Sequence, residues 1–380
     1  MLNNCTLTGN NGSTGGAVFS CILNNCIISN NLAIYGGGAY GSKLTNCTII
    51  GNTAFAAGGG RNGGAYSSTL FNCMIVSNTA SEGGGAGGST LYNCLIIGNQ
   101  ATNGSGGGAS SCNLYNCLIQ SNVATNTAAC TGGGVYQGTV VNCTIVSNTA
   151  VSEGGINGST MSNTIIYYNK ALNGTDNNYL SSSTLNYCCT TPLPASGTGN
   201  FINAPVFANL LTNNYRLQSS SLCINAGNNS VVIGTNDLDG NPRIAGGTVD
   251  IGAYEYQTPA SILSYFWAQQ NAFSINGTDD YADPDHDGMN NYQEWKAGTL
   301  PRNAFSVLKL ASPTNSIVGT KVTWQSVSGV TYYLQRATNL AAQPPFTTYV
   351  SNLTGLAVST SYTDTTATNA TPYFYRIGVQ

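Results

Sequence analysis

The tightest restriction on the fold comes from a short motif that recurs along the first half of the chain. It reads NCTLTGN at 4–10, NCLIIGN at 93–99 and NCTIVSN at 142–148. Its cysteine falls at positions 5, 26, 47, 73, 94, 117 and 143, and Thr164 takes the next place, so the intervals are 21 to 26 residues. Such a period is typical of solenoids, in which stacking of neighbouring units supplies the core.

The residues around the cysteine predict short strands joined by tight turns. An aliphatic residue or Met stands three places before it and another aliphatic two places after it, and asparagine stands immediately before it and again five places after it. The alternation of inward and outward residues that marks a strand holds after the cysteine but breaks before it, so we expect a bend at the preceding asparagine. Asparagine tolerates left-handed backbone, and its amide can bond to the equivalent asparagine one coil away. We therefore predict a right-handed parallel β-helix with about 21–26 residues per coil. The ladder positions are Asn46, Cys47, Asn72, Cys73, Asn93, Cys94, Asn116, Cys117, Asn142 and Cys143.

The cysteines are predicted to be buried free thiols. Coils stack about 4.8 Å apart, which is wider than the Cβ separation of about 3.8 Å that a disulfide prefers. A small thiol behaves as a buried hydrophobe. The ladder is thus a structural element and neither a disulfide framework nor a zinc site.

Composition restricts the partners. Only 7% of the residues are charged, and the net charge is −3. Without a run of Lys or Arg, we expect neither nucleic acid nor an anionic membrane surface as partner, and no apolar stretch is long enough to span a membrane. The chain begins in mid-repeat without a leader, so we expect an exported, monomeric part of a longer protein at the cell surface or outside the cell.

By its repeats the chain resembles the pectate-lyase-like β-helix superfamily, in which many members cleave acidic polysaccharides. That resemblance implies clusters of carboxylates or a catalytic Arg or Lys. Residues 1–199 contain only Lys43, Arg61, Glu82, Glu153, Lys170 and Asp176 as charged side chains. Glycoside hydrolysis needs two carboxyl groups about 5 to 10 Å apart, and Glu153 with Asp176 is the one pair on adjoining coils. A lyase or hydrolase that uses this pair, or coils outside this chain, is the alternative to a non-catalytic protein.

All extra residues of the longer coils fall on one corner of the rod. Beside that corner runs a column that contains Phe19, Tyr40, Tyr66 and Tyr136. Aromatic rings next to lengthened loops can form a glycan-binding groove, whereas the alternative is that solenoids simply tolerate insertions there. A polysaccharide or another cell-surface ligand is the expected partner.

Residues 200–257 are predicted to cap the rod. The stretches YRLQSSS, INAG, DLDGNPR and VDIGAYEY resemble the closing segment of bacterial surface proteins of the choice-of-anchor Q type. An open β-helix end exposes unpaired strand edges, and Arg243 with Asp250 or Asp237 is expected to hold a polar cap over it.

Residues 283–294, DPDHDGMNNYQE, match the EF-hand calcium loop position by position. The expected ligands are Asp283, Asp285, Asp287, the carbonyl of Met289, Asn291 and the bidentate Glu294, with Gly288 at the sharp turn. A helix is expected upstream within 261–273, and Gly298 and Pro301 end a short helix downstream. The loop resembles the single calcium repeats of dockerin and thrombospondin type 3 kind, which implies structural calcium in a linker over 258–302.

Residues 303–380 contain short alternating runs that predict a small β-sandwich. VTWQSVSGVTYYLQRATNL and PYFYRIGV resemble fibronectin type III-like modules. We expect β-helix repeats over 1–199, a cap over 200–257, a calcium-loop linker and this module. The function that we expect is adhesion or glycan binding by a non-catalytic surface protein with structural calcium.

Overall fold

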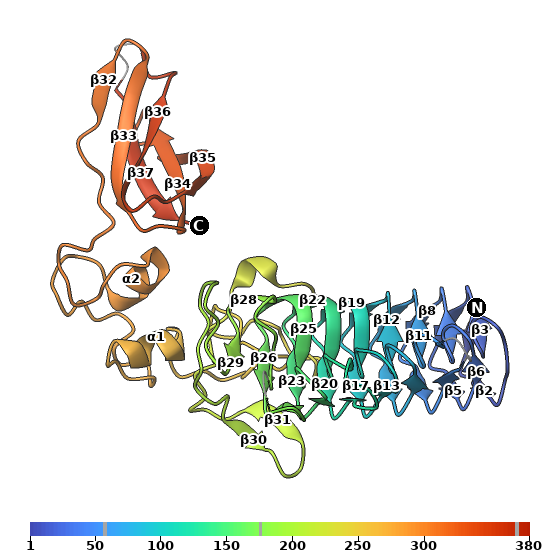
Figure 1. The fold of residues 1–380 in the computed structure, drawn as a ribbon. Helices are drawn as coiled ribbons and strands as arrows, with labels where there is room; N and C mark the ends of the chain where they lie inside the picture. The colour runs from blue at the N-terminus through green and yellow to red at the C-terminus, as the bar shows by residue number, and fades with distance from the viewer. Residues whose placement is uncertain (56–58, 175–176, 369–371) are drawn as a thin grey trace. The chain divides into compact units, whose positions relative to one another are not determined.

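The computed structural model describes residues 1–55, 59–174, 177–368 and 372–380, and the chain forms two compact units, 1–266 and 267–380. The first unit is the predicted parallel β-helix, whose coils lie side by side from β2 to β29 (Figure 1). Each coil contributes strands to three parallel sheets. The finer four-part division expected from the sequence stays a prediction.

The strands of the three sheets are short. One sheet has nine strands, β2 (Thr6–Thr8), β5 (Ile27–Ser29), β9 (Thr48–Ile50), β13 (Met74–Val76), β17 (Leu95–Ile97), β20 (Leu118–Gln120), β23 (Thr144–Val146), β26 (Ile165–Tyr167) and β29 (Cys189–Thr190). Another has seven, β6 (Leu32–Ala33), β10 (Thr53–Ala54), β14 (Thr79–Ala80), β18 (Gln100–Ala101), β21 (Val123–Ala124), β24 (Thr149–Ala150) and β27 (Lys170–Ala171).

The third sheet begins as two parallel lanes that merge. One lane is β1 (Leu2–Asn3), β4 (Ile22–Asn24), β8 (Lys43–Thr45), β12 (Thr69–Phe71) and β16 (Thr90–Tyr92), and the other is β3 (Val18–Phe19), β7 (Ala39–Tyr40), β11 (Ala65–Tyr66) and β15 (Ala86–Gly87). Both lanes pair with the longer strand β19 (Ala109–Tyr115), and β22 (Val135–Val141), β25 (Ile156–Ser162) and β28 (Thr184–Asn186) follow.

The register places identical columns on top of one another, as the sequence predicts. Leu70 pairs with Leu44 and Leu91, and Ile75 pairs with Ile49 and Ile96, all fully buried. The asparagines before the ladder positions have φ of 50° to 53°, so they form the predicted left-handed bend; they are Asn4, Asn25, Asn46, Asn72, Asn93, Asn116, Asn142 and Asn163. The burial of this apolar stack is the main force that holds the coils together.

The polar ladder inside the rod lies five residues after the cysteine. Asn99 Oδ1 accepts the N–H and the Nδ2 of Asn78 at 2.9 and 3.0 Å, and Asn99 Nδ2 donates to Asn122 Oδ1 at 3.0 Å and to the Ile75 carbonyl at 2.9 Å. The predicted side-chain ladder at the bend asparagines is confined, among the described residues, to one bond from Asn72 to Asn46 at 3.2 Å. The bend side chains point outward, and therefore the interior column makes the continuous ladder.

All thirteen cysteines are free thiols, as predicted for the ladder. The residues of the ladder also accept hydrogen bonds. The N–H of Cys26 donates to Cys47 Sγ at 3.4 Å, and the N–H of Cys143 donates to the Thr164 hydroxyl at 3.4 Å. The residue at this position therefore accepts a backbone N–H from the previous coil, a role that both thiol and hydroxyl can fill.

Residues 200–257 cover more than the end of the rod. Phe201 pairs with Cys189 of the last coil, but Asn228 exchanges hydrogen bonds with Asn163 at 2.8 and 2.9 Å, and the N–H of Ala253 donates to Thr144 at 3.0 Å. Outward-facing Ile165 is therefore 1% exposed, whereas its equivalent Ile27 is 46% exposed. The segment includes β30 (Phe207–Asn209), β31 (Asn214–Leu217) and a 3-10 helix, η1 (Asn229–Val231).

The C-terminal unit combines most of one short helix and the whole of another with two three-stranded antiparallel sheets. Helix α1 (Tyr265–Gln270) lies within the predicted 261–273, and α2 (Asn291–Ala297) ends at Gly298 as predicted. The sheets are β32 (Thr314–Ser316), β33 (Gly319–Ser326) and β36 (Val358–Asp364), and β35 (Thr347–Thr354), β34 (Thr331–Ala337) and β37 (Phe374–Val379). Trp324 and Tyr332 are buried in their core, with ring centroids 5.9 Å apart. Among the described residues, no helix is long and apolar enough to cross a membrane.

Candidate functional site

The candidate site is the loop 283–294, in which three carboxylates converge. One oxygen each of Asp283, Asp285 and Asp287 lie within 4.8 Å of one another. Calcium binds oxygens at 2.3–2.6 Å, so two ligands of one ion are at most about 5 Å apart. The three side chains therefore have the spacing of ligands to a common cation.

Further oxygens of the same loop are buried without a hydrogen-bond partner. Six such atoms belong to the five predicted side-chain ligands: Asp283 Oδ1, both oxygens of Asp285, Asp287 Oδ2, Asn291 Oδ1 and Glu294 Oε2. Asn291 and Glu294 are fully buried. A buried oxygen without a donor costs free energy, and a cation that accepts several of them at once removes that cost. The donor set, four carboxylates and an amide, consists of the hard oxygen ligands that calcium takes.

The electrostatics of the loop are unfavourable without a cation. Burial, followed by the charges of Asp285 and Asp287, raises the pKa of Glu294 to about 7. The Glu294 carboxylate accepts one long side-chain bond, from the Thr299 hydroxyl at 3.4 Å. Four acids in one small region repel one another, and the divalent charge of a bound ion would offset that repulsion.

The backbone of the loop is shaped by its own turn chemistry. Gly288 has φ of 95°, a conformation that favours glycine, and its N–H donates to Asp283 at 3.1 Å. Asn290 caps α2 with a capping box that it shares with Gln293. Helix α2 begins within the loop, at Asn291, but α1 ends at Gln270 and is separated from Asp283 by irregular chain. Only the downstream half of a helix-loop-helix unit is therefore present.

Besides the bond from the Thr299 hydroxyl, backbone N–H groups of the chain that follows α2 also bond to this loop. The N–H of Leu308 donates to Met289 Sδ at 3.2 Å, and the N–H of Thr299 donates to the Glu294 carbonyl at 3.1 Å. Met289 and Glu294 are the seventh and twelfth positions of the loop. The segment 299–308 is therefore bonded to the loop at both of its ends.

The predicted glycan-binding aromatics form a cluster only in part. Phe19 and Tyr40 stack with centroids 5.4 Å apart, Tyr66 meets Tyr40 edge-on at 5.2 Å, and Tyr35, which sequence reasoning missed, lies 6.4 Å from Tyr66. Tyr136 belongs to β22 and is separated from this cluster by Gly87 and Ser110 of the same column. Because Phe19 and Tyr40 face each other, one face of each ring is already covered.

A second aromatic ladder lies outside the predicted groove. Phe71, Tyr92 and Tyr115 stack at 4.9 and 5.1 Å with interplanar angles of 6° and 18°, and the Lys43 ammonium lies 5.4 Å from the Phe71 ring. The signal was in the sequence, since these residues share the column two places before the cysteine. Their ring faces are used by one another, so this ladder stabilises neighbouring coils.

Of the predicted catalytic pair, only Glu153 lies among the residues that the structure describes. Glu153 is buried in left-handed backbone with φ of 45°, and its carboxylate accepts bonds from Ser152 at 2.8 Å and Asn157 at 3.1 Å. Asp176 lies outside the described residues.

The cap contains a buried charge cluster with partners that differ from those predicted. The Arg243 guanidinium lies 3.5 Å from Glu255 and donates to the carbonyls of Asp250 and Gly252, each at 2.9 Å. The Asp250 carboxylate instead accepts the backbone N–H groups of Asn225 and Tyr256. The Asp237 carboxylate accepts those of Asp239, Asn241 and Glu255. These bonds tie distant parts of the segment together, so the cluster has a structural role.

No protein-family model matches the chain, and no curated protein matches it significantly.

Proposed function

We propose that this protein is an exported, non-catalytic surface protein for adhesion or glycan binding, with a calcium ion that stabilises its C-terminal unit. The observation that carries the calcium proposal is the set of six buried, unpartnered oxygens in the loop 283–294. The resemblances to choice-of-anchor Q, dockerin and fibronectin type III-like modules support an extracellular setting. The parallel β-helix supports the role of a rigid display scaffold.

In this proposal the side chains of Asp283, Asp285, Asp287, Asn291 and Glu294, with the carbonyl of Met289, hold the ion. Calcium would supply positive charge and would cross-link the loop to the first turn of α2. A single site of this kind, with an affinity suited to millimolar extracellular calcium, has a structural role. It would fix the loop and α2 as one body within the C-terminal unit.

Isothermal titration with calcium chloride tests the proposal. We expect one site with a Kd of about 0.1–1 mM, as in extracellular modules. The heat should disappear in the double variant Asp283→Ala with Glu294→Ala and persist in Glu82→Ala, which removes a half-buried acid from the rod. Absence of binding, or unchanged binding in the double variant, would contradict the proposal.

Glycan binding by Phe19, Tyr40, Tyr66 and Tyr136 is proposed on the clustering of the first three rings and the exposure of Phe19. Phe19 is 57% exposed and Tyr35 is 42% exposed. Retention of the protein in gels that contain a bound polysaccharide should fall in the double variant Phe19→Ala with Tyr40→Ala if this surface binds the glycan. The single variant Tyr136→Ala then shows whether the binding surface extends along the rod.

A polysaccharide lyase or glycoside hydrolase is the second candidate, and one observation favours it. A buried glutamate in left-handed backbone, as at Glu153, is a strained feature that is enriched at functional sites. Release of reducing ends or unsaturated products by this chain, measured with and without calcium, would establish the enzyme and refute the non-catalytic proposal. Loss of that release in Glu153→Gln would assign the residue.

A further inference from the structure

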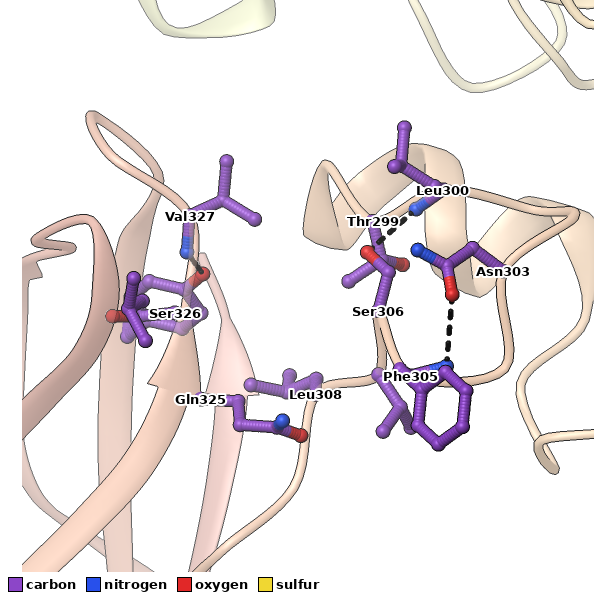
Figure 2. Close-up of a pocket in the computed structure, with 12 residues that line it drawn as sticks. Thr299, Leu300, Asn303, Phe305, Ser306, Leu308, Gln325, Ser326 and Val327 are labelled. Atoms are coloured by element: carbon purple, nitrogen blue, oxygen red, sulfur yellow. Dashed lines mark hydrogen bonds between the residues drawn. The ribbon is translucent and has the colours of Figure 1, made fainter.

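The C-terminal unit contains a pocket that the sequence did not indicate. It has a volume of about 260 Å³ and lies between the segment 299–308, which follows α2, and the end of β33 with the turn after it. Figure 2 shows Leu300, Asn303 and Phe305 on one side and Gln325 and Val327 on the other. Leu308 lies on the chain that joins the two sides (Figure 2).

The segment 299–308 is held in shape by its own hydrogen bonds. Ser306 Oγ accepts the N–H of Leu300 at 3.0 Å, Asn303 Oδ1 accepts the N–H of Phe305 at 3.2 Å, and the Asn303 carbonyl accepts the N–H of Ser306 at 2.7 Å. This framework presents Phe305 to solvent, with 87% of its surface exposed. The bonds fix the backbone at Phe305, and its exposed ring beside the pocket offers an apolar face to a ligand.

The residues that line the pocket suit a neutral polar ligand with one apolar face. None of the twelve lining residues is charged. The Asn303 oxygen is used within the loop, which leaves its amide N–H groups directed at ligand acceptors, and Gln325 adds an exposed amide that both donates and accepts. The C–H face of a pyranose packs on an aromatic ring, while its hydroxyls bond to amides.

We infer that this pocket binds one unit of a neutral polysaccharide, with Phe305 as the stacking ring and Asn303 and Gln325 as hydrogen-bonding residues. The inference rests on the proposed glycan-binding function and adds a binding site in the C-terminal unit to the aromatic surface proposed on the rod. It rests on the proposed calcium site only for its calcium dependence. Met289 and Glu294 contact the two ends of the pocket segment, so calcium bound to the loop would order the pocket.

Titration of the full chain with neutral hexasaccharides tests the inference, with cellohexaose, laminarihexaose, maltohexaose and mannohexaose as probes and hexagalacturonic acid as the charged control. We expect at least one neutral probe to bind with a Kd of about 0.1–1 mM in 5 mM calcium, as a shallow single-unit pocket allows. Phe305→Ala should weaken that binding at least ten-fold. Phe55→Ala, which removes an exposed phenylalanine from the rod, should leave it unchanged.

Each remaining outcome decides a separate part of the inference. Binding that survives Phe305→Ala but is lost in the double variant Phe19→Ala with Tyr40→Ala would return the site to the rod and overturn the inference. Binding of no neutral probe, or concentration-dependent self-association that Phe305→Ala abolishes, would also overturn it. Binding that is equal with calcium and with EDTA would refute the coupling to the calcium loop alone. The calcium titration of the double variant tests the ion site independently.

Discussion

The interior asparagine column of the rod and the loop 283–294 both bury side-chain oxygens, but only the column completes their hydrogen bonding with protein atoms. Asn99 makes four bonds to neighbouring coils through its amide. In the loop, both oxygens of Asp285 lack a partner. The asparagine column is therefore complete within the protein, whereas the loop has the composition of a site that a cation completes.

The largest effect should come from a break in the rod's polar ladder. Asn99→Leu removes the acceptor of the Asn78 N–H and the donor to the Ile75 carbonyl, in a fully buried position. We expect a loss of about 3–5 kcal/mol in the free energy of unfolding, at about 1–3 kcal/mol for each orphaned group. Urea unfolding followed by far-UV circular dichroism measures it.

Asn103→Leu is the matched control, because Asn103 is exposed and its change should stay within about 0.5 kcal/mol. Equal effects of the two substitutions would show that the interior ladder contributes nothing beyond composition.

The C-terminal unit also contains one carboxylate that is fully paired by protein atoms. Asp364 is buried and accepts bonds from Arg336 at 2.8 Å and Tyr375 at 2.8 Å. Burial alone would raise its pKa, but these bonds and those from Thr366 outweigh burial and hold the pKa of Asp364 below its usual range. Asp364→Asn should destabilise this unit by about 2–4 kcal/mol at pH 7.

The pH dependence of this pair has a defined sign. Because the folded-state pKa is lowered, the stabilisation is complete above the unfolded pKa of about 4 and is lost as the pH falls below it. All three tryptophans of the chain, Trp267, Trp295 and Trp324, lie in the C-terminal unit, so tryptophan fluorescence reports its unfolding selectively. If Asp364→Asn lost stability with falling pH as steeply as the wild type, Asp364 would not be the source of this acid sensitivity.

Calcium should stabilise the C-terminal unit and leave the rod unchanged. At 10 mM calcium and a Kd of about 0.1–1 mM, mass action gives about 1–3 kcal/mol. The tryptophan-detected midpoint should rise with calcium and return with EDTA, whereas the unfolding of the rod should not shift. Equal shifts in both units would indicate a non-specific salt effect.

The sequence predicted the parts of the fold that repeat or obey local turn chemistry. The columns of Leu, Ile, Asn and Cys determined the register of the coils. Gly288 forms a turn, and Asn290 and Gly298 cap α2, through interactions with residues close in the sequence. It did not predict that 200–257 runs along the flank, because outward-facing Thr144 and Ile165 look like ordinary strand residues until a distant segment covers them. The pocket beside Phe305 was missed for the same reason, since its two sides are brought together only by tertiary packing.

For the loop, the clustering of Asp283, Asp285 and Asp287 was predictable because their spacing along the chain brings the carboxylates together. The absence of a helix directly before Asp283 was not, because helical periodicity at 261–273 gives no measure of the distance to the loop. The stacking of aromatic rings was also missed. A column of aromatics in the sequence does not show whether the ring faces point to solvent or to one another.

A comparison of wild type and Glu294→Gln, with and without calcium at pH 8, tests whether the loop is a cation site. Without calcium the variant should be more stable by about 1–2 kcal/mol, because it removes a buried charge whose pKa is raised to about 7. With 10 mM calcium the wild type should gain about 1–3 kcal/mol and the variant much less, because the variant loses the ligand at position 12. A variant that is less stable than the wild type under both conditions, or equally responsive to calcium, would contradict the account.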